Sequence, residues 1–172
     1  MRLDQFNALT YDEAYKDLQR CCGARRWATQ MTARRPFRTV DDVFTAADQV
    51  WAGCTRDDVL EAFRHHPKIG DVASLRSRFA TTQKWAEGEQ AGVRAAAEEV
   101  LKRLAAGNEA YEQKFGYIFI VCATGKTADE MLALLEERLR NQPAAELKIA
   151  AGEQAKITRI RLGKLLQEES LA

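Results

Sequence analysis

The sequence has few of the residues that metal centres and disulfide frameworks need. Its 172 residues include four cysteines and two histidines, and no cysteines are spaced C-x-x-C. Four cysteines are too few for a disulfide scaffold at this length, so we expect reduced thiols in a cytoplasmic protein. The two histidines, His65 and His66, are adjacent. Neighbouring residues of a helix point about 100° apart, so this pair cannot easily grip one ion, and we expect no bound metal.

Long apolar runs and an excess of one charge are also missing. No apolar run approaches the roughly 20 residues that span a bilayer, and the polar N-terminus lacks the apolar core of a signal peptide. The formal net charge is +1, which gives no general reason to expect binding to nucleic acid or membrane. A chain of this length suits one hydrophobic core, so we expect a single domain over residues 1–172.

The stretches between the three prolines have the patterns of helices. A long helix is expected from near Glu89 to Gln113, and a last one from near Ala144 to Gln167. Four threonines are placed to cap helices, because acidic residues that suit a first turn follow each of them. These are Thr10, Thr39, Thr55 and Thr127. The sequence therefore predicts an all-α fold, a single-domain bundle of about eight helices.

Residues 117–122 read Tyr-Ile-Phe-Ile-Val-Cys and depart from the helical pattern. This β-branched and aromatic run could by itself be a buried strand. No obvious strand partner exists elsewhere in the sequence, so we expect a buried extended or irregular segment.

Residues 20–38 contain six arginines and no acidic residue. A nucleic-acid-binding face is one interpretation, and it would make the protein a non-enzymatic helical adaptor. A solvated or interface surface is the other, and the balanced charge of the remaining chain favours it.

Helical phase singles out His66. Val59, Phe63 and His66 fall at i, i+4 and i+7, on one face of a helix, while His65 falls away from it. Pro67 disfavours further helix, so His66 should lie at a helix C-terminus and point inward. The helix dipole there favours a protonated imidazole, which suits a proton donor, whereas burial favours the neutral ring. The alternative is a core histidine bonded to a backbone carbonyl.

Two charged residues fall on helix faces that should be apolar. Glu89 shares a stripe with apolar residues of the long helix and would lie at its N-terminus, where a carboxylate is favoured. Arg161 falls at the middle of the apolar face of the last helix, where it needs a carboxylate or an anionic ligand. The two could form a structural ion pair. Alternatively, together with His66, they could bind a small anionic molecule and move a proton.

The ordered motifs of the chain resemble those of one family. Residues 63–71 resemble its His-Pro-x-Ile-Gly signature, Glu89-Gln90-Ala91-Gly92 resembles its Glu-Gln element, and residues 108–123 resemble its longest signature. Arg138-x-x-Asn141, Glu146-Leu147 and Ile157-x-x-x-Arg161-Leu162 complete the pattern. The chain thus resembles the 2-oxo-4-hydroxy-4-carboxy-5-ureidoimidazoline (OHCU) decarboxylases over nearly its whole length, most weakly before residue 55.

The resemblance implies a cofactor-free carboxy-lyase of urate breakdown, all-helical and commonly a homodimer. Such an enzyme converts the small-molecule substrate OHCU to (S)-allantoin and carbon dioxide. His66, Glu89 and Arg161 would be catalytic, which agrees with the helical phases. Substrate contacts would come from Pro67, Gln90, Phe119, Ile120, Val121, Cys122 and Ala123. The family usually has Ser or Thr three residues before the glutamate, and here Ala86 stands at that substrate-binding position.

A thiol hydrolase that pairs Cys122 with His66 is a further alternative. It requires a thiolate of low pKa, and the apolar run around Cys122 acts against one.

Overall fold

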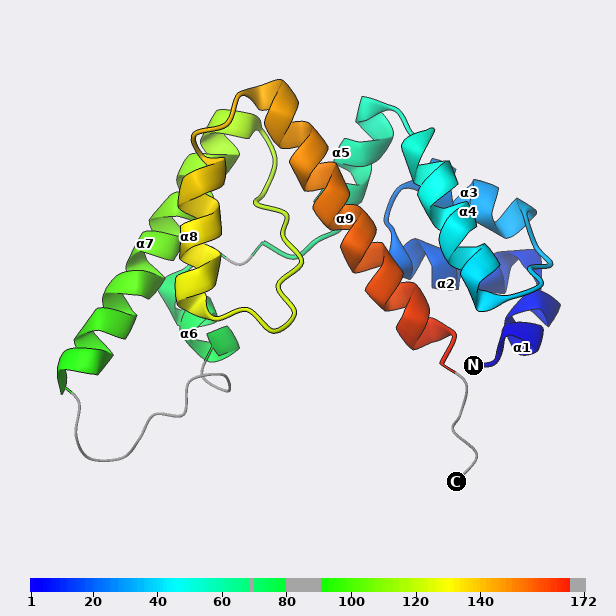
Figure 1. Cartoon of the computed structure of the whole chain (residues 1–172), viewed down its shortest axis with the longest axis horizontal. Coiled ribbons are helices and arrows are strands. Elements are labelled where there is room, and N and C mark those ends of the chain that lie inside the picture. The colour runs from blue at the N-terminus through cyan, green and yellow to red at the C-terminus, as the bar shows by residue number, and fades with distance from the viewer. Residues whose placement is uncertain (69, 80–90, 168–172) are drawn as a thin grey trace. The chain divides into compact units, whose positions relative to one another are not determined.

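The computed structural model describes residues 1–68, 70–79 and 91–167, with the side chains of 91–94 excepted. Nine helices lie in this part of the chain, and none of its residues belongs to a strand, so the predicted all-α fold is confirmed. None of these helices is long and apolar enough to cross a membrane. The helices are α1 (Leu3–Ala8), α2 (Tyr11–Cys21), α3 (Arg25–Ala33), α4 (Val40–Ala52), α5 (Arg56–Arg64), α6 (Val72–Phe79), α7 (Ala91–Phe115), α8 (Ala128–Arg138) and α9 (Pro143–Leu165) (Figure 1).

Contacts between residues divide the chain into two compact units. Unit 1 comprises Met1–His66 and Ala151–Ala172, and unit 2 comprises Pro67–Ala150. Unit 1 therefore holds α1 to α5 and the later part of α9, while unit 2 holds α6, α7, α8 and the first turns of α9.

Four helices begin at the threonines that the sequence predicts as caps. In each, the threonine hydroxyl accepts the backbone N–H three residues later, and the acidic side chain there accepts the threonine N–H. Such a cap typically stabilises a helix by about 1 kcal/mol. These reciprocal pairs join Thr10 with Glu13, Thr39 with Asp42, Thr55 with Asp58, and Thr127 with Glu130.

The core of unit 1 is built around α3, which contacts α2, α4 and α5. Trp27 of α3 is fully buried, and its indole N–H donates to the Ala47 carbonyl of α4 over 3.1 Å. Trp51 of α4 donates in the same way to the Ala151 carbonyl of α9 over 3.0 Å. Trp27 is thus buried and Trp51 partly buried, each with its one polar group satisfied, which fixes how α4 packs within the unit.

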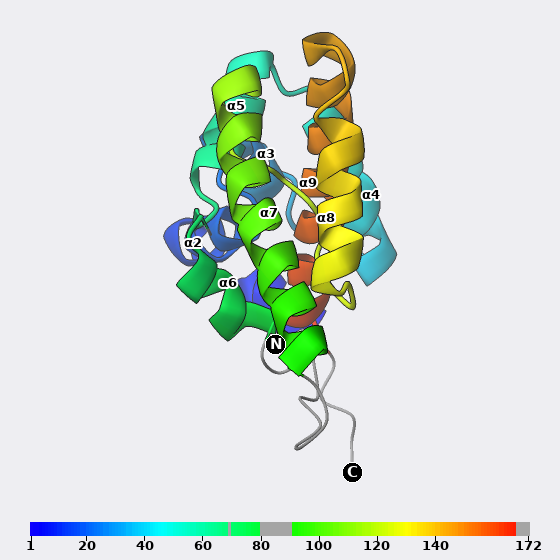
Figure 2. The ribbon, with the colours of Figure 1, turned by 90° about the vertical axis from the view of Figure 1, so that its left-hand side faces the viewer.

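The framework of unit 2 is the pair α7 and α8, which lie side by side and run in the same direction (Figures 1 and 2). A Cβ atom on Gly107 would lie 2.6 Å from Leu135 Cδ2, so any larger residue there would force the Leu135 side chain to shift. Residues 116–127 return from the end of α7 to the start of α8 (Figures 1 and 2). This return begins at Gly116, whose φ is +81°. Residues 117–122 form neither helix nor strand, which fits the predicted irregular segment, and within it Tyr117 and Ile120 are buried while the others are half-buried.

Candidate active site

His66 lies just beyond the C-terminus of α5. Its backbone N–H donates to the Phe63 carbonyl over 3.1 Å, and its side chain is half-buried. Val59 and Phe63, which share its predicted face, are buried, while His65 is exposed. The helical phase therefore identified which of the two adjacent histidines turns inward.

The imidazole of His66 ends a chain of hydrogen bonds along α9. Its Nε2 lies 2.5 Å from Gln154 Oε1, and Gln154 Nε2 donates to Thr158 Oγ1 over 3.1 Å. Gln154 and Thr158 are both buried. Because the amide nitrogen of Gln154 faces Thr158, its oxygen faces His66, and that oxygen can only accept. His66 Nε2 therefore carries the proton, and Nδ1 presents a lone pair.

Burial lowers the pKa of His66 below its ordinary value of 6.5. The bond to Gln154 acts in the opposite direction, and the positive charges of Arg161 and His65 lower the pKa further. The sequence left the charge of this ring open, since the helix dipole and burial oppose each other. Burial prevails, so His66 is a neutral base at pH 7.

Arg161 lies at the edge of the buried face of α9, whereas the sequence predicted the middle of that face. The buried residues of α9 follow steps of four along the chain: Glu146, Ala150, Gln154, Thr158 and Leu162, with Leu166 continuing the row just after the helix ends. A row of residues four apart winds slowly around the helix axis. A buried face predicted from the average helical period therefore departs from the true buried face over the 23 residues of α9. The guanidinium is half-buried, and its Nη1 donates to the Arg20 carbonyl over 3.3 Å.

Part of the predicted site falls outside the described residues. Glu89, Gln90 and Ala86 lie there. Thr82 and Trp85, which are candidates to replace the hydroxyl contact that the family usually makes at position 86, lie there too. The predicted alternatives for Glu89, a catalytic carboxylate or an ion-pair partner of Arg161, therefore stay predictions. No described carboxylate forms an ion pair with Arg161.

Unit 2 contains a buried ion pair that the sequence reading did not anticipate. Arg138 Nε donates to Glu146 Oε1 over 2.7 Å, and the two side chains are 7% and 0% exposed. Tyr111 donates its hydroxyl to the same oxygen over 2.5 Å, and Asn141 donates to Glu146 Oε2 over 2.9 Å. Burial, followed by the bond to Glu146, raises the pKa of Tyr111. Each carboxylate oxygen thus has a donor, as a buried charge requires.

This buried cluster fastens the extended segment that holds five predicted substrate contacts, Phe119 to Ala123. Arg138 Nη1 donates to the Ile120 carbonyl over 2.7 Å, and the guanidinium carbon lies 4.5 Å from the centroid of the Phe119 ring. Lys126 Nζ donates to the Cys122 carbonyl over 2.9 Å. These bonds engage carbonyl groups. No hydrogen bond among the described residues takes the N–H of Phe119, Val121 or Ala123, so these donors are available to a ligand.

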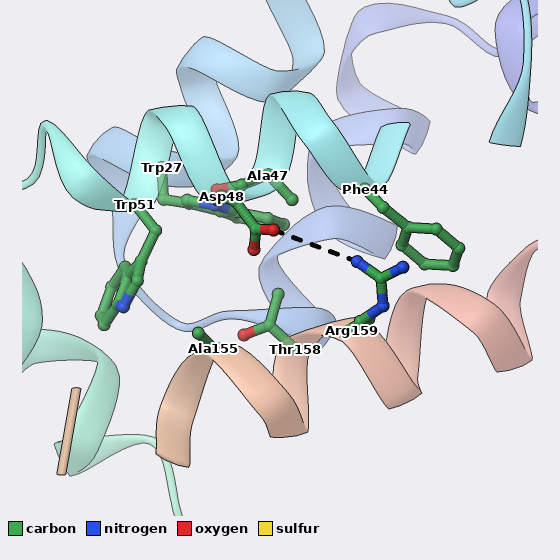
Figure 3. Close-up of a pocket in the computed structure, with 8 residues that line it drawn as sticks. All are labelled: Trp27, Phe44, Ala47, Asp48, Trp51, Ala155, Thr158 and Arg159. Carbon is green, nitrogen blue, oxygen red and sulfur yellow. Dashed lines mark hydrogen bonds and ion pairs between the residues drawn. The ribbon is translucent and has the colours of Figure 1, made fainter. Parts of the chain in front are cut away.

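A small hollow in unit 1 lies between α4 and α9 and has too little room for a substrate (Figure 3). Its volume is about 10 Å³, which suits about one water molecule. The guanidinium carbon of Arg159 lies 4.2 Å from the centroid of the Phe44 ring, and Asp48 Oδ2 lies 4.0 Å from Arg159 Nη1. Thr158 lines the same hollow, so the far end of the His66 chain of bonds abuts it.

The arginines of residues 20–38 mostly contact groups of unit 1. Arg35 donates to the Phe6 and Leu9 carbonyls, each over 2.9 Å, and so ties down the end of α1. The other contacts are Arg20 with Asp17 at 3.1 Å, Arg25 with Glu61 at 2.6 Å, Arg26 with Asp58 at 3.8 Å, and Arg34 with Gln49 at 3.0 Å. A surface already engaged in this way does not favour the adaptor interpretation.

All four cysteines lie among the described residues, and none of them forms a disulfide. Burial raises the pKa of Cys21 to about 11, of Cys22 to about 12 and of Cys54 to about 11. These three are therefore protonated at neutral pH, which disfavours nucleophilic chemistry. Within the described ranges, no three His, Cys, Asp or Glu side chains gather in a metal-binding arrangement.

Comparison with known proteins places the chain in a family. The family model of OHCU decarboxylase matches residues 7–163. An Arabidopsis thaliana uric acid degradation bifunctional protein is 39% identical over 152 residues, which are 87% of this chain and 46% of that protein. The OHCU decarboxylase of Amia calva is 28% identical over 97% of this chain and 95% of its own. The chain thus spans less than half of the first relative and nearly all of the second.

Solved structures agree with this assignment. A crystal structure of OHCU decarboxylase in the presence of (S)-allantoin has a TM-score of 0.71 and 38% identity, covering 88% of this chain and 98% of the other. A crystal structure of (S)-allantoin synthase has a TM-score of 0.72 at 18% identity, covering 97% of this chain and 54% of the other, and it shares the fold. The chain belongs to the OHCU decarboxylase family.

Proposed function

We propose that this chain decarboxylates OHCU to (S)-allantoin and carbon dioxide in urate breakdown, with no cofactor. The observation that carries the proposal is the inward His66, neutral and held by Gln154 with its Nδ1 lone pair available. Family membership supplies the substrate class. The adaptor alternative is not favoured, because most arginines of residues 20–38 are engaged within unit 1.

The substrate provides its own electron sink. Its carboxylate lies on a carbon that bears a hydroxyl, next to a ring C=N group. When the bond to carbon dioxide breaks, its electron pair moves into that C=N. The nitrogen of that group takes up a proton, which leaves an enol. The hydroxyl then loses its proton to give the carbonyl of allantoin while the neighbouring ring carbon gains one, so the reaction as a whole takes up one proton from solvent. Pyridoxal phosphate or thiamine, which serve as electron sinks elsewhere, are not needed.

His66 is assigned as the main acid and base. As a neutral imidazole, it can accept the hydroxyl proton at Nδ1 and return a proton later in the reaction. Transfers of this kind typically contribute on the order of 10²–10⁴ to the rate. Glu89 is assigned as its partner at the hydroxyl, from the family motif. Because a group that bound the departing carboxylate tightly would stabilise the ground state, Arg161 is assigned to ring or ureido oxygens.

The remaining substrate contacts are assigned from the same motifs. The N–H groups of the segment Phe119 to Ala123 would hold ring or ureido oxygens, and their availability supports this role. Pro67, Gln90 and Ala86 complete the set. Thr82, Trp85 or a water molecule would replace the contact that Ala86 cannot make. We further propose that residues 1–172 act as one functional domain, since one family model spans both units. From the family resemblance, we also propose that this domain acts as a cytoplasmic homodimer.

The direct test is turnover of OHCU generated from urate in the same cuvette. We expect the chain to accelerate loss of OHCU and to produce (S)-allantoin, seen as a growing circular dichroism signal. Spontaneous decay gives racemic product and no such signal. A decay rate equal to the enzyme-free control, with no optical activity, would refute the proposed function.

A further inference from the structure

A second cavity of unit 1 lies beside Arg161. It has a volume of about 340 Å³, which falls within the roughly 300–1,000 Å³ typical of small-molecule sites. Its walls come from α2, from the turn after α2, from the end of α5 and from α9. All these elements belong to unit 1. His66 does not line this cavity, so it is separate from the imidazole that we assign to proton transfer.

The lining of this cavity is strongly cationic. Lys16 and Arg20 of α2, His65 after α5 and Arg161 of α9 contribute four basic side chains, and among the described residues no carboxylate lines it. Arg161 donates one N–H to the Arg20 carbonyl. A guanidinium has five donors in all, so a ligand can still bond to it. Asp17 pairs with Arg20 from outside the lining, at 3.1 Å. The basic side chains at this hollow outnumber the carboxylates that interact with them, Asp17 with Arg20 and Glu13 with Lys16, and this excess favours a bound anion.

The His65 wall is shaped by Gly23. A Cβ atom on Gly23 would lie 2.4 Å from His65 Cγ, so glycine is needed for the imidazole to pack against this turn. His65 Nδ1 lies 2.9 Å from the Glu61 carbonyl and donates to it. The imidazole of His65 is therefore held by its packing against Gly23 and by the bond from Nδ1 to the Glu61 carbonyl. Its Nε2 is left as the nitrogen available to a ligand.

We propose that this cavity is a binding site for a small doubly charged oxyanion of the phosphate type, and that the bound anion competes with substrate for Arg161. The second clause rests on the proposed function, whereas the first stands on the cavity alone. An anion held by Lys16 and Arg20 would attract the guanidinium of Arg161, which among the described residues bonds to the Arg20 carbonyl alone. Occupancy would thus withdraw Arg161 from substrate and inhibit the enzyme.

Calorimetric titration with inorganic phosphate tests the site without reference to turnover. Sodium chloride should hold the ionic strength constant, since screening alone weakens exposed charge interactions. We expect saturable binding of one phosphate per chain. Lys16→Gln and Arg20→Gln should each weaken it about two- to fivefold, the range expected for exposed ion pairs. Arg38→Gln removes an exposed arginine of the same unit that does not line the cavity, and should leave the affinity unchanged.

Two results would overturn the site. One is the absence of saturable heat with phosphate, and the other is equal weakening by Arg38→Gln, which would mean that net charge alone attracts the anion.

Steady-state kinetics test the competition. Phosphate should raise the KM for OHCU at unchanged kcat. The Lys16→Gln/Arg20→Gln double variant should keep the phosphate-free kcat/KM and lose most of the response to phosphate. A fall in its phosphate-free kcat/KM would refute a separate site, since the cavity would then serve substrate itself. An inactive wild-type chain would refute the proposed function but not the cavity, which the titration tests independently.

Discussion

Replacing Gln154 by leucine removes the acceptor that faces His66 Nε2 while roughly keeping the volume of a buried side chain. In the wild-type chain, the 2.5 Å contact to Gln154 Oε1 holds the proton on Nε2 and leaves Nδ1 as the base. Without this acceptor, both neutral tautomers become accessible. The same bond raises the pKa of His66, so its loss should lower that pKa further. The variant therefore affects the base in two ways without touching the base itself.

The size of the effect follows from the geometry. A buried hydrogen bond that loses one partner costs about 1–3 kcal/mol. If this energy holds the reactive tautomer in place, its loss lowers kcat by on the order of 5- to 150-fold. Substrate contacts are unaffected, so KM should change little. Gln154→Glu is the matched control, because it keeps an oxygen acceptor at Nε2 and should raise the pKa of His66.

Nitrogen-15 NMR of the imidazole measures this directly. At pH 7 the wild-type spectrum should show His66 protonated at Nε2 alone, and Gln154→Leu should show both tautomers. His65 provides an internal reference, since it bonds the Glu61 carbonyl through Nδ1. A wild-type His66 protonated at Nδ1, or a Gln154→Leu variant with unchanged kcat and tautomer, would refute the reasoning.

Three further predictions concern stability, measured by urea denaturation. Glu146→Leu leaves the buried guanidinium of Arg138 without its carboxylate, so it should cost about 3–5 kcal/mol; a loss below 1 kcal/mol would argue against the buried pair. Gly23→Ala should lower the free energy of unfolding by about 1–3 kcal/mol through the clash with His65. The double variant Gly23→Ala/His65→Gly should recover most of that free energy, and a double variant as unstable as Gly23→Ala would speak against the clash. Because the pKa of His66 is lowered on folding, the unfolded state binds more protons between the folded value and 6.5. The free energy of unfolding should therefore rise with pH through this window and level off above 6.5. This rise should be absent in His66→Asn, and an identical pH profile in that variant would contradict the assignment.

Local signals in the sequence predicted local structure well. The four threonine caps are confirmed because each box involves only residues three apart, such as Thr55 and Asp58. The inward His66 was likewise readable, since Val59 and Phe63 set its face within two helical turns. Helix α1 was missed because no serine, threonine, aspartate or asparagine caps it, and Arg2 stands at that position instead.

Long-range partners were not readable in the same way. Gln154 is a polar residue on the apolar face of the last helix, but its partner His66 is 88 residues away, and nothing in either pattern encodes that pairing. Tyr111 and Glu146 are 35 residues apart for the same reason. Arg161 was placed too centrally because a small error in helical period accumulates along α9. Glu146, the first residue of the buried row of α9, gives no sign in the sequence that it is buried, because its position in a motif says nothing of its partner Arg138.

The most direct test of the account compares His66→Asn with His65→Asn in the OHCU assay. Asparagine keeps a polar side chain at each position but cannot exchange a proton near neutral pH. We predict that His66→Asn loses the accelerated decay of OHCU while its helical circular dichroism is retained, and that His65→Asn remains nearly as active as wild type in phosphate-free buffer. Full activity of a folded His66→Asn variant would contradict the central claim that this imidazole moves the proton.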